Sequence, residues 1–313
     1  MKKFFFPVLC LSIALTACNT GGQQSSSTGT MSVSASFYPL AFFTEQIGEN
    51  LVTVHQITPG GVEPHDYDPS PQEIAAIYDS KVFIMNGAGV DAWGDKIIDD
   101  LKQKGVVTVR MEDTMSLLGG FNEQGESDPL HPSSQDTNIL DPHIWLDPVN
   151  AEGEVSRIRD ALVTADPAHT DTYNSNAAAL EAKLSALDTA YKNGLAHCTL
   201  HDAVVSHNAF RYMAQRYGFT TLAIAGLDPE QEPTPQRIAE LADFAKKNNI
   251  KYIFFEALVS PKVSQTVADE IGAQSLVLDP LEGLTPDEEK NGDTYLTIMQ
   301  QNLQNLRTAL QCQ

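Results

Sequence analysis

The strongest constraint on the fold is an alternation of short apolar segments with amphipathic helical segments, which continues from residue 32 to residue 310. The apolar segments, such as residues 81–85 and 252–255, are bounded by turn residues and have the length of buried strands. Strands that alternate with helices favour parallel sheets, because each helix carries the chain back to the start of the next strand. The sequence therefore predicts an α/β fold with largely parallel sheets.

The longest predicted helix, residues 170–195, divides this alternation into two halves. Apolar residues recur there at intervals of three and four, which predicts one buried face. A helix of about 26 residues extends roughly 39 Å, about the distance from one domain to another. A chain of 313 residues can bury two cores. We therefore expect two α/β lobes, residues 32–165 and 198–313, joined by a rigid linking helix within residues 166–197.

The individual elements follow from the same periodicities and from capping signals. The predicted strands are residues 33–37, 51–57, 81–85, 106–109, 203–206, 221–225, 252–255 and 276–278. The predicted helices are residues 39–47, 90–103, 149–163, 170–195, 209–217, 234–248, 261–271 and 295–310. A further helix is expected to begin behind Ser70, where Pro71 and Glu73 complete the pattern of a capping box.

The N-terminal residues 1–17 have the composition of a secretory signal peptide. Two lysines precede an apolar run that is too short for a permanent membrane span. The sequence Leu-Thr-Ala-Cys that follows resembles a bacterial lipoprotein cleavage box, which would make Cys18 the lipidated first residue of the mature protein. The alternative is an ordinary signal peptide with an incidental cysteine. Residues 18–31 are polar and rich in Gly and Ser, so we expect a lipidated flexible tether.

Four cysteines are present, and two of them, Cys10 and Cys18, belong to the export segment. The other pair, Cys198 and Cys312, would lie in an oxidising compartment and are free to form one disulfide. Such a bond would tie the end of the chain back to the second lobe.

The formal net charge of −21 comes from 41 acidic and 20 basic residues. This balance argues against a nucleic-acid partner, because phosphate contacts need a basic face. Most of the acidic residues are explained by a solvated exterior, which favours solubility and mildly concentrates cations.

Three histidines occupy equivalent places in this pattern. His65 and His207 each follow a predicted strand, and His143 stands between two Asp-Pro turns at the head of a predicted helix. In open α/β sheets, ligands bind outside the carboxyl ends of the strands, and imidazoles are common ligands of transition metals. Each histidine alone is as readily explained as a capping or core residue. Together the three predict a metal site.

A carboxylate would complete a tetrahedral site. Asp279 follows the strand predicted at residues 276–278 and is our expected fourth ligand, although an Asp before Pro is also common turn chemistry. Glu256, at the end of another strand, is the competing carboxylate, and Glu63 is first explained as part of the turn before His65. Three imidazoles and one carboxylate suit Zn²⁺, at roughly 2.0 to 2.2 Å, whereas Mn²⁺ normally takes more oxygen ligands.

Residues 113–142 lack periodicity and are rich in Gly, Ser, Asp and Pro, so we expect a surface loop over the cleft between the lobes. The loop carries His131. This residue could capture metal transiently, but a lone histidine in an acidic loop is more often solvated.

Four segments carry a resemblance to a known family. They are residues 63–69 (Glu-Pro-His-Asp-Tyr-Asp-Pro), 141–148 (Asp-Pro-His-Ile-Trp-Leu-Asp-Pro), 206–210 (Ser-His-Asn-Ala-Phe) and 255–261 (Phe-Glu-Ala-Leu-Val-Ser-Pro). From about Ser32 to Leu310, the chain resembles the metal-binding lipoproteins that serve ABC importers of zinc and manganese, the cluster A-I solute-binding proteins. Within that family it is most similar to the zinc-uptake, ZnuA-like branch.

The resemblance implies two lobes joined by one long helix, a metal ion in the cleft between them, and limited hinge motion. It places the ligands at His65, His143, His207 and Asp279. Manganese members typically have a glutamate where this chain has His207, so the resemblance implies Zn²⁺. Many zinc members carry a long histidine-rich loop, whereas residues 121–140 contain only His131 here. Mn²⁺ and Fe²⁺ therefore stay open as less favoured ions.

The expected function is that of an exported, lipid-anchored binding protein, in the periplasm or on the outer face of the cell membrane. It would capture Zn²⁺ as a monomer and deliver it to an ABC permease in the inner membrane, without being an enzyme. A zinc hydrolase is the alternative from another class, with metal-bound water in the fourth position and Glu256 or Glu63 as base. The sequence has no H-E-x-x-H motif or nucleophile elbow to support it. A third possibility is an adhesin, a role reported for some lipoproteins of this family.

Overall fold

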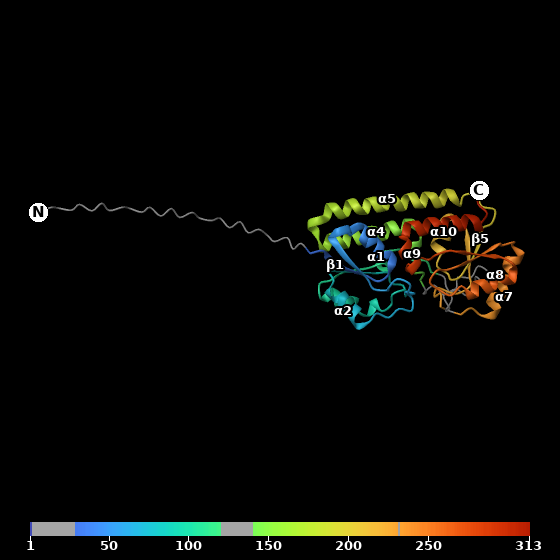
Figure 1. Ribbon diagram of the computed structural model, residues 1–313, viewed down its shortest axis with the longest axis horizontal. Coiled ribbons are helices and arrows are strands. Elements are labelled where there is room, and N and C mark those ends of the chain that lie inside the picture. The colour runs from blue at the N-terminus through green and yellow to red at the C-terminus, as the bar shows by residue number, and fades with distance from the viewer. Residues whose placement is uncertain (2–28, 120–139, 231) are drawn as a thin grey trace.

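The computed structural model describes residues 1, 29–119, 140–230 and 232–313. One four-stranded parallel sheet contains, in spatial order, β2 (Val52–Gln56), β1 (Met31–Ala35), β3 (Val82–Met85) and β4 (Val107–Arg110). The second contains β6 (Thr220–Ala223), β5 (Asp202–Val205), β7 (Tyr252–Phe255) and β8 (Gln274–Val277), again all parallel. The two sheets therefore have the same topology, and the predicted α/β architecture with two parallel-sheet lobes is confirmed (Figure 1).

Helices pack on both faces of these sheets. They are α1 (Tyr38–Gly48), α2 (Pro71–Asp79), α3 (Ile98–Gln103), α4 (Pro148–Ala165), α5 (Thr170–Gly194), α6 (Arg211–Tyr217), α7 (Pro235–Lys247), α8 (Lys262–Ile271), α9 (Pro286–Asn291) and α10 (Tyr295–Ala309). Short 3-10 turns are η1 (Glu49–Leu51), η2 (Gly94–Lys96), η3 (Met111–Asp113), η4 (Ile144–Leu146) and η5 (Pro167–His169). Among the described residues, no helix is both long and apolar enough to cross a membrane.

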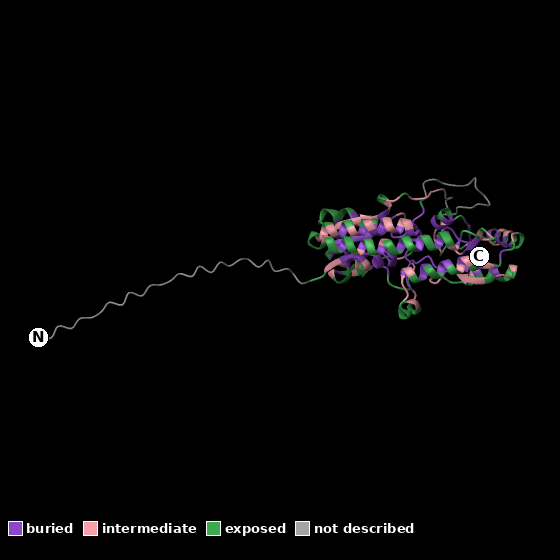
Figure 2. Ribbon diagram, turned by 90° about the horizontal axis from the view of Figure 1, so that it is seen from above, coloured by how far each residue is buried: buried purple, intermediate pink, exposed green. Residues whose placement is uncertain are grey.

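The long helix α5 extends over 25 residues and runs along both lobes (Figure 1). It packs against α1 and α4 in the first half of the chain and against α10 in the second. Figure 2 shows this helical side of the molecule, where exposed and buried residues alternate along the helices. That pattern is expected of helices with one face on a core.

The residues of the central strand β3 divide between two cores. Val82 and Ile84 of β3 face the core that lies under the long helices, while Phe83 and Met85 face a separate core with α2 and α3. The core under the long helices is continuous and includes apolar residues of both lobes. Separating the lobes would expose this shared apolar surface, which limits how far they can move.

One predicted helix differs from the structure. Residues 90–93 form turns, and helical structure is confined to η2 and the short α3. The carboxylate of Asp91 accepts hydrogen bonds from the backbone N–H groups of Asn86 and Gly87, at 2.7 and 2.8 Å. These bonds draw the Asp91 side chain back onto the preceding residues and hold residues 86–91 as a tight loop, so helical structure begins only after it. By contrast, the capping box predicted at Ser70 is confirmed.

Some predictions concern residues outside those that the structure describes. They are the signal peptide and lipidation site, with Cys10 and Cys18, and the role of His131.

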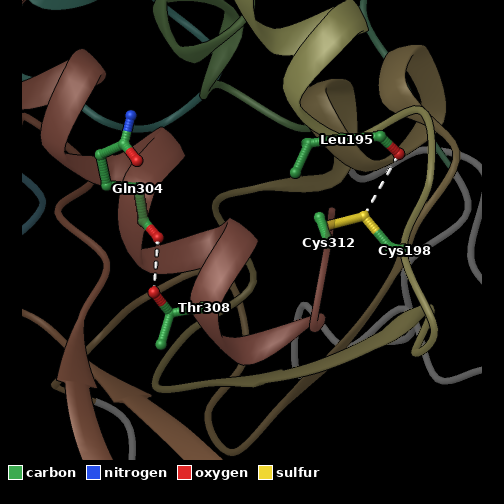
Figure 3. The surroundings of a disulfide bond; sticks show 5 residues. All are labelled: Leu195, Cys198, Gln304, Thr308 and Cys312. Carbon is green, nitrogen blue, oxygen red and sulfur yellow. Dashed lines mark hydrogen bonds between the residues drawn. A yellow bond between two sulfur atoms is a disulfide. The ribbon is translucent and has the colours of Figure 1, made fainter.

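The predicted disulfide between Cys198 and Cys312 is confirmed (Figure 3). Cys198 follows α5 and Cys312 follows α10, so the bond joins the ends of two long helices. Backbone hydrogen bonds support the same junction, from Thr199 N–H to the Gln311 carbonyl and from Leu200 N–H to the Leu310 carbonyl.

Replacing both cysteines by serine should lower the free energy of unfolding by about 2 to 4 kcal/mol, because the bond closes a long loop of the unfolded chain. The two cysteines are 114 positions apart in the sequence. Urea denaturation of the wild type and of C198S/C312S, each with and without reductant, measures the effect. The double variant is the control, since reductant should not change its stability. Equal stability of the two oxidised proteins would contradict the prediction.

Candidate metal centre

Four side chains converge at one point between the two lobes: His65, His143, His207 and Glu282. His65 and His143 precede α5 in the chain, and His207 and Glu282 follow it. His65 lies in the loop between β2 and α2, and His143 directly precedes η4. His207 and Glu282 lie in the loops after β5 and β8. The structure thus brings together the three histidines that the sequence singled out.

The four ligand atoms of this group lie at the corners of a tetrahedron with all edges within 4.8 Å, and four of its six edges are known more closely. Oε1 of Glu282 lies 3.4 Å from Nε2 of His65, 3.2 Å from Nε2 of His143 and 3.3 Å from Nε2 of His207. The Nε2 atoms of His143 and His207 are 3.1 Å apart. The centre of a regular tetrahedron lies about 0.61 edge lengths from its corners, so edges of these four lengths correspond to an ion about 1.9 to 2.1 Å from the atoms that they join. Zinc bonds to nitrogen and oxygen have these lengths.

Burial makes the group unfavourable without a cation. The side chains of His143, His207 and Glu282 have no exposed surface, and that of His65 is 9% exposed. Nε2 of His65 and both carboxylate oxygens of Glu282 are buried without a hydrogen-bond partner in the described structure. Buried polar atoms of this kind are normally satisfied. A bound cation would satisfy them.

The pKa values of His143, His207 and Glu282 are each shifted by their neighbours. Burial acts to lower the pKa of His207, but the charges of Glu256 and Glu282 outweigh it and hold this pKa well above its ordinary value. For His143, burial is likewise outweighed, by its close contacts with Asp141 and Glu282, and its pKa is raised. Burial acts to raise the pKa of Glu282, but the surrounding imidazoles, with His207 foremost, hold it well below its usual range. The site therefore favours a carboxylate next to positive charge.

Neighbouring carboxylates orient the rings of two histidines. Oδ1 of Asp141 accepts hydrogen bonds from the backbone N–H of His143 and contacts its Nδ1, at 3.0 and 2.8 Å. Oε1 of Glu256 accepts from the backbone N–H of His207 at 3.1 Å, contacts its Nδ1 at 2.6 Å, and also accepts from the hydroxyl of Ser206. A proton held on Nδ1 leaves the lone pair of Nε2 directed at the ion.

Glu63 and Glu256, which the sequence analysis weighed as less favoured ligands, lie beside the four-residue group and are not part of it. Oε1 of Glu63 accepts the backbone N–H of His65 at 3.2 Å. Burial, together with the nearby Glu282, raises the pKa of Glu63 to about 10. A protonated Glu63 is a weak ligand, so its evident contact is with the backbone of the His65 loop.

Replacing Glu256 by alanine should lower metal affinity about 10- to 100-fold, because His207 would lose the group that orients its ring. Glu256→Gln should lose less metal affinity, since its amide oxygen still accepts a hydrogen bond from Nδ1 of His207. Competition against a chelating dye at constant pH measures both variants. Glu270, an exposed residue of α8, provides the control as Glu270→Ala. An unchanged affinity for Glu256→Ala would contradict the orienting role.

The carboxylate that the structure places with the three histidines is that of Glu282, and the expected fourth ligand, Asp279, is not part of this group. Oδ1 of Asp279 accepts the backbone N–H of Leu281 at 2.7 Å, so this carboxyl group closes the turn after β8. The turn then directs Glu282, three residues later, toward the histidines. The sequence contains a single sign of Glu282. It is the second acidic residue in the loop after β8, and Asp279 is the first.

A cleft of about 480 Å³ reaches the group from outside. Residues from both halves of the chain line it: His65, Ala88, Gly89, Glu112, Leu140, Pro142, Leu227 and Asp228. Of the four ligand residues, His65 is the one that lines this cleft and the one with exposed surface. The metal centre therefore lies in an interlobe cleft, as predicted.

A two-lobed α/β protein that closes three imidazoles and one carboxylate around a point between its lobes is, by class, a metal-binding solute-binding protein. Residues 33–309 match the family described as "Zinc-uptake complex component A periplasmic" (ZnuA). The chain belongs to this family, and the resemblance found in its four sequence segments is confirmed.

Relatives and solved structures agree with this placement. The zinc-binding lipoprotein AdcA of Streptococcus pneumoniae is 38% identical over 309 residues, covering 98% of this chain and 61% of AdcA. The high-affinity zinc uptake system protein ZnuA of Bacillus subtilis is 35% identical, covering 97% of this chain and 96% of that protein. The crystal structure of the Zn(II)-bound ZnuA-like domain of S. pneumoniae AdcA has a TM-score of 0.76 at 36% identity, covering 90% of this chain and 99% of that domain. The chain thus spans about three fifths of AdcA.

Proposed function

We propose that this protein captures one Zn²⁺ ion between its lobes outside the cytoplasm and delivers it to an ABC permease for high-affinity zinc uptake. The observation that carries the proposal is the tetrahedron of three imidazole nitrogens and one carboxylate oxygen, four of whose six edges measure 3.1 to 3.4 Å. The family and the zinc-related names of its members support it.

The composition of the site favours Zn²⁺ over Mn²⁺ or Fe²⁺. Zinc accepts four ligands with nitrogen predominating, whereas manganese sites normally contain more oxygen. The site also favours capture over hydrolysis. A zinc hydrolase keeps one position for water, and here Glu282 takes the fourth corner.

Binding by these residues depends on pH. The ion and protons compete for the imidazole nitrogens, so affinity falls as the pH is lowered. The pKa values of His143 and His207 lie above the ordinary value of 6.5, so this competition begins above pH 6.5. Because two ligand residues precede α5 and two follow it, loss of the ion would remove the bridge between the lobes.

The surrounding organisation belongs to the same proposal. Residues 1–17 direct export, Cys18 carries a lipid, and residues 18–31 tether the protein to the membrane, in the periplasm or on the outer face of the cell membrane. Residues 32–165 form the first lobe, residues 166–197 the link and residues 198–313 the second lobe. This division is supported by the order of the two sheets around α5. The protein acts as a monomer, and its partner is an inner-membrane permease.

Metal competition tests the proposed function directly. The purified protein is stripped with a chelator, offered Zn²⁺ and Mn²⁺ together, and its bound metal is counted by elemental analysis. We expect one tightly held zinc per chain and no manganese. Preference for manganese, or the absence of binding better than micromolar, would overturn the assignment to zinc.

A further inference from the structure

We propose that Asp279 is a positioning residue for the metal site: it fixes the loop that carries Glu282 and does not itself bind the ion. The inference rests on the proposed function, and it assigns a distinct role to the acidic residue nearest to the strand end. Three observations carry it. They are the contacts of Asp279, the backbone conformation of the next residues, and the absence, among the described residues, of a regular hydrogen bond that holds the Glu282 carboxylate.

The first observation is a set of hydrogen bonds that fixes both ends of the Asp279 residue. Its backbone N–H donates to Oδ1 of Asn302 at 2.9 Å, and its carbonyl accepts from Nδ2 of the same amide at 2.7 Å. Its own Oδ1 accepts the backbone N–H of Leu281 at 2.7 Å. Asp279 and Asn302 are 2% and 1% exposed, so water does not compete for these bonds.

The second observation is the conformation that these bonds impose. Leu281 has a φ of 57°, in the left-handed region that a leucine side chain disfavours. The side chain of Asp279 holds this conformation through the Leu281 N–H, as aspartate does in tight turns. Between them, the carbonyl of Pro280 accepts from the indole Nε1 of Trp145 at 2.7 Å. Three successive residues before Glu282 are thus held in place.

The third observation concerns Glu282 itself. His143 and His207 each have a carboxylate that fixes the ring, whereas the Glu282 carboxylate faces the three imidazoles of the site at 3.2 to 3.4 Å and makes no hydrogen bond of regular geometry within the described structure. Its position among these rings therefore depends on the backbone that carries it. The loop continues across the lobe boundary, where the Leu284 carbonyl accepts from Gly61 N–H at 2.8 Å, and then enters α9 (Figure 1).

The other oxygen of Asp279 agrees with this role. Oδ2 is buried and has no hydrogen-bond partner among the described residues. Burial raises the pKa of Asp279 well above its ordinary value, and the neighbouring Glu288 raises it further. Glu288 is itself held, since its Oε2 accepts from the backbone and hydroxyl of Thr285. Because Oδ1 alone makes the bond to the turn, an amide, which keeps one accepting oxygen, should replace this carboxyl group well.

The decisive experiment measures the zinc affinity of Asp279→Asn and Asp279→Ala, each as a single variant and together with Glu282→Ala. Positioning predicts that Asp279→Asn keeps the wild-type affinity within about threefold, because its amide oxygen still accepts from Leu281. The zinc affinity of Asp279→Ala should be about 10- to 100-fold lower than that of the wild type. In the Glu282→Ala background, Asp279→Ala should lower zinc affinity by a further factor of less than about three, because its effect acts through Glu282.

Two further measurements keep the test independent of folding. Asn302→Ala removes the bonds to the Asp279 backbone and should lose affinity in the wild type but not in the Glu282→Ala background. With Co²⁺ as the probe, the intense visible bands of a tetrahedral site should be unchanged in Asp279→Asn and altered in Asp279→Ala.

The proposal is overturned if Asp279→Asn loses as much affinity as Asp279→Ala, or if Asp279→Ala lowers affinity further when Glu282 is absent. Both results would make Asp279 a ligand. An unchanged affinity of Asp279→Ala would also overturn it. Failure of the wild type to bind zinc would instead count against the proposed function, and the two failures are therefore distinguishable.

Discussion

Replacing His207 by alanine is expected to lower zinc affinity about a thousandfold, the largest effect of any single substitution considered. Zinc held by four protein ligands binds with roughly 10 to 16 kcal/mol, so each ligand contributes on the order of 3 to 4 kcal/mol, or two to three powers of ten. His207 is fully buried, and its loss also leaves Glu256 without the imidazole that it contacts at 2.6 Å. The buried Glu256 carboxylate keeps its bonds from Ser206 and the backbone but loses one partner, which adds to the cost.

The same strand supplies a matched control. His201 directly precedes β5 and is exposed, whereas His207 follows β5 and is buried. His201→Ala should therefore bind zinc like the wild type. Titration in competition with a chelator of known affinity, with metal counting on the purified variants, measures both. If His207→Ala held zinc within tenfold of the wild type, the three-histidine site would be the wrong site.

The three histidines could be predicted because their positions repeat a topological rule. His65 and His207 follow strands, His143 heads a helix, and parallel strands bring such positions to one edge. The strands could be recognised in the sequence because both faces of each sheet are covered. The two cores on either side of β3 illustrate this. Runs of apolar residues then mark strands without alternation.

The fourth ligand could not be predicted by this rule, because it depends on contacts between distant residues. Asp279 and Glu282 are both acidic and lie in the same loop, and the strand end favours Asp279. The choice is made by Asn302 on α10 and by the positive φ of Leu281, neither of which has a local sequence signature. The helix expected at residues 90–103 was wrong for a similar reason, since the side chain of Asp91 pairs with backbone donors of the preceding loop.

Replacing Glu154 by glutamine is expected to stabilise the metal-free protein by about 3 to 5 kcal/mol at pH 8 and by little at pH 4.5. Glu154 is on α4, has no exposed surface, and neither of its oxygens has a hydrogen-bond partner among the described residues. Burial raises its pKa from 4.5 to about 8. The folded state therefore disfavours the charged form of this residue.

The sign of the pH dependence follows from that shift. Below pH 4.5 the carboxyl group is protonated in both the folded and the unfolded chain, so it costs nothing. Between pH 4.5 and about 8 the unfolded chain ionises while the folded protein keeps its proton. Folding stability consequently falls as the pH rises through this range and is constant above it. Glutamine cannot ionise, so the variant lacks this loss.

Urea denaturation of the chelator-treated protein at pH 4.5, 6 and 8 separates this effect from metal binding and from the histidines, which are common to both proteins. The difference between Glu154→Gln and the wild type should grow steadily with pH. Asp160, an exposed acid on the same helix, gives the control as Asp160→Asn, for which no growing difference is expected. A difference that is the same at all three pH values would mean that Glu154 is ionised in the folded protein and that its buried charge is stabilised by a partner.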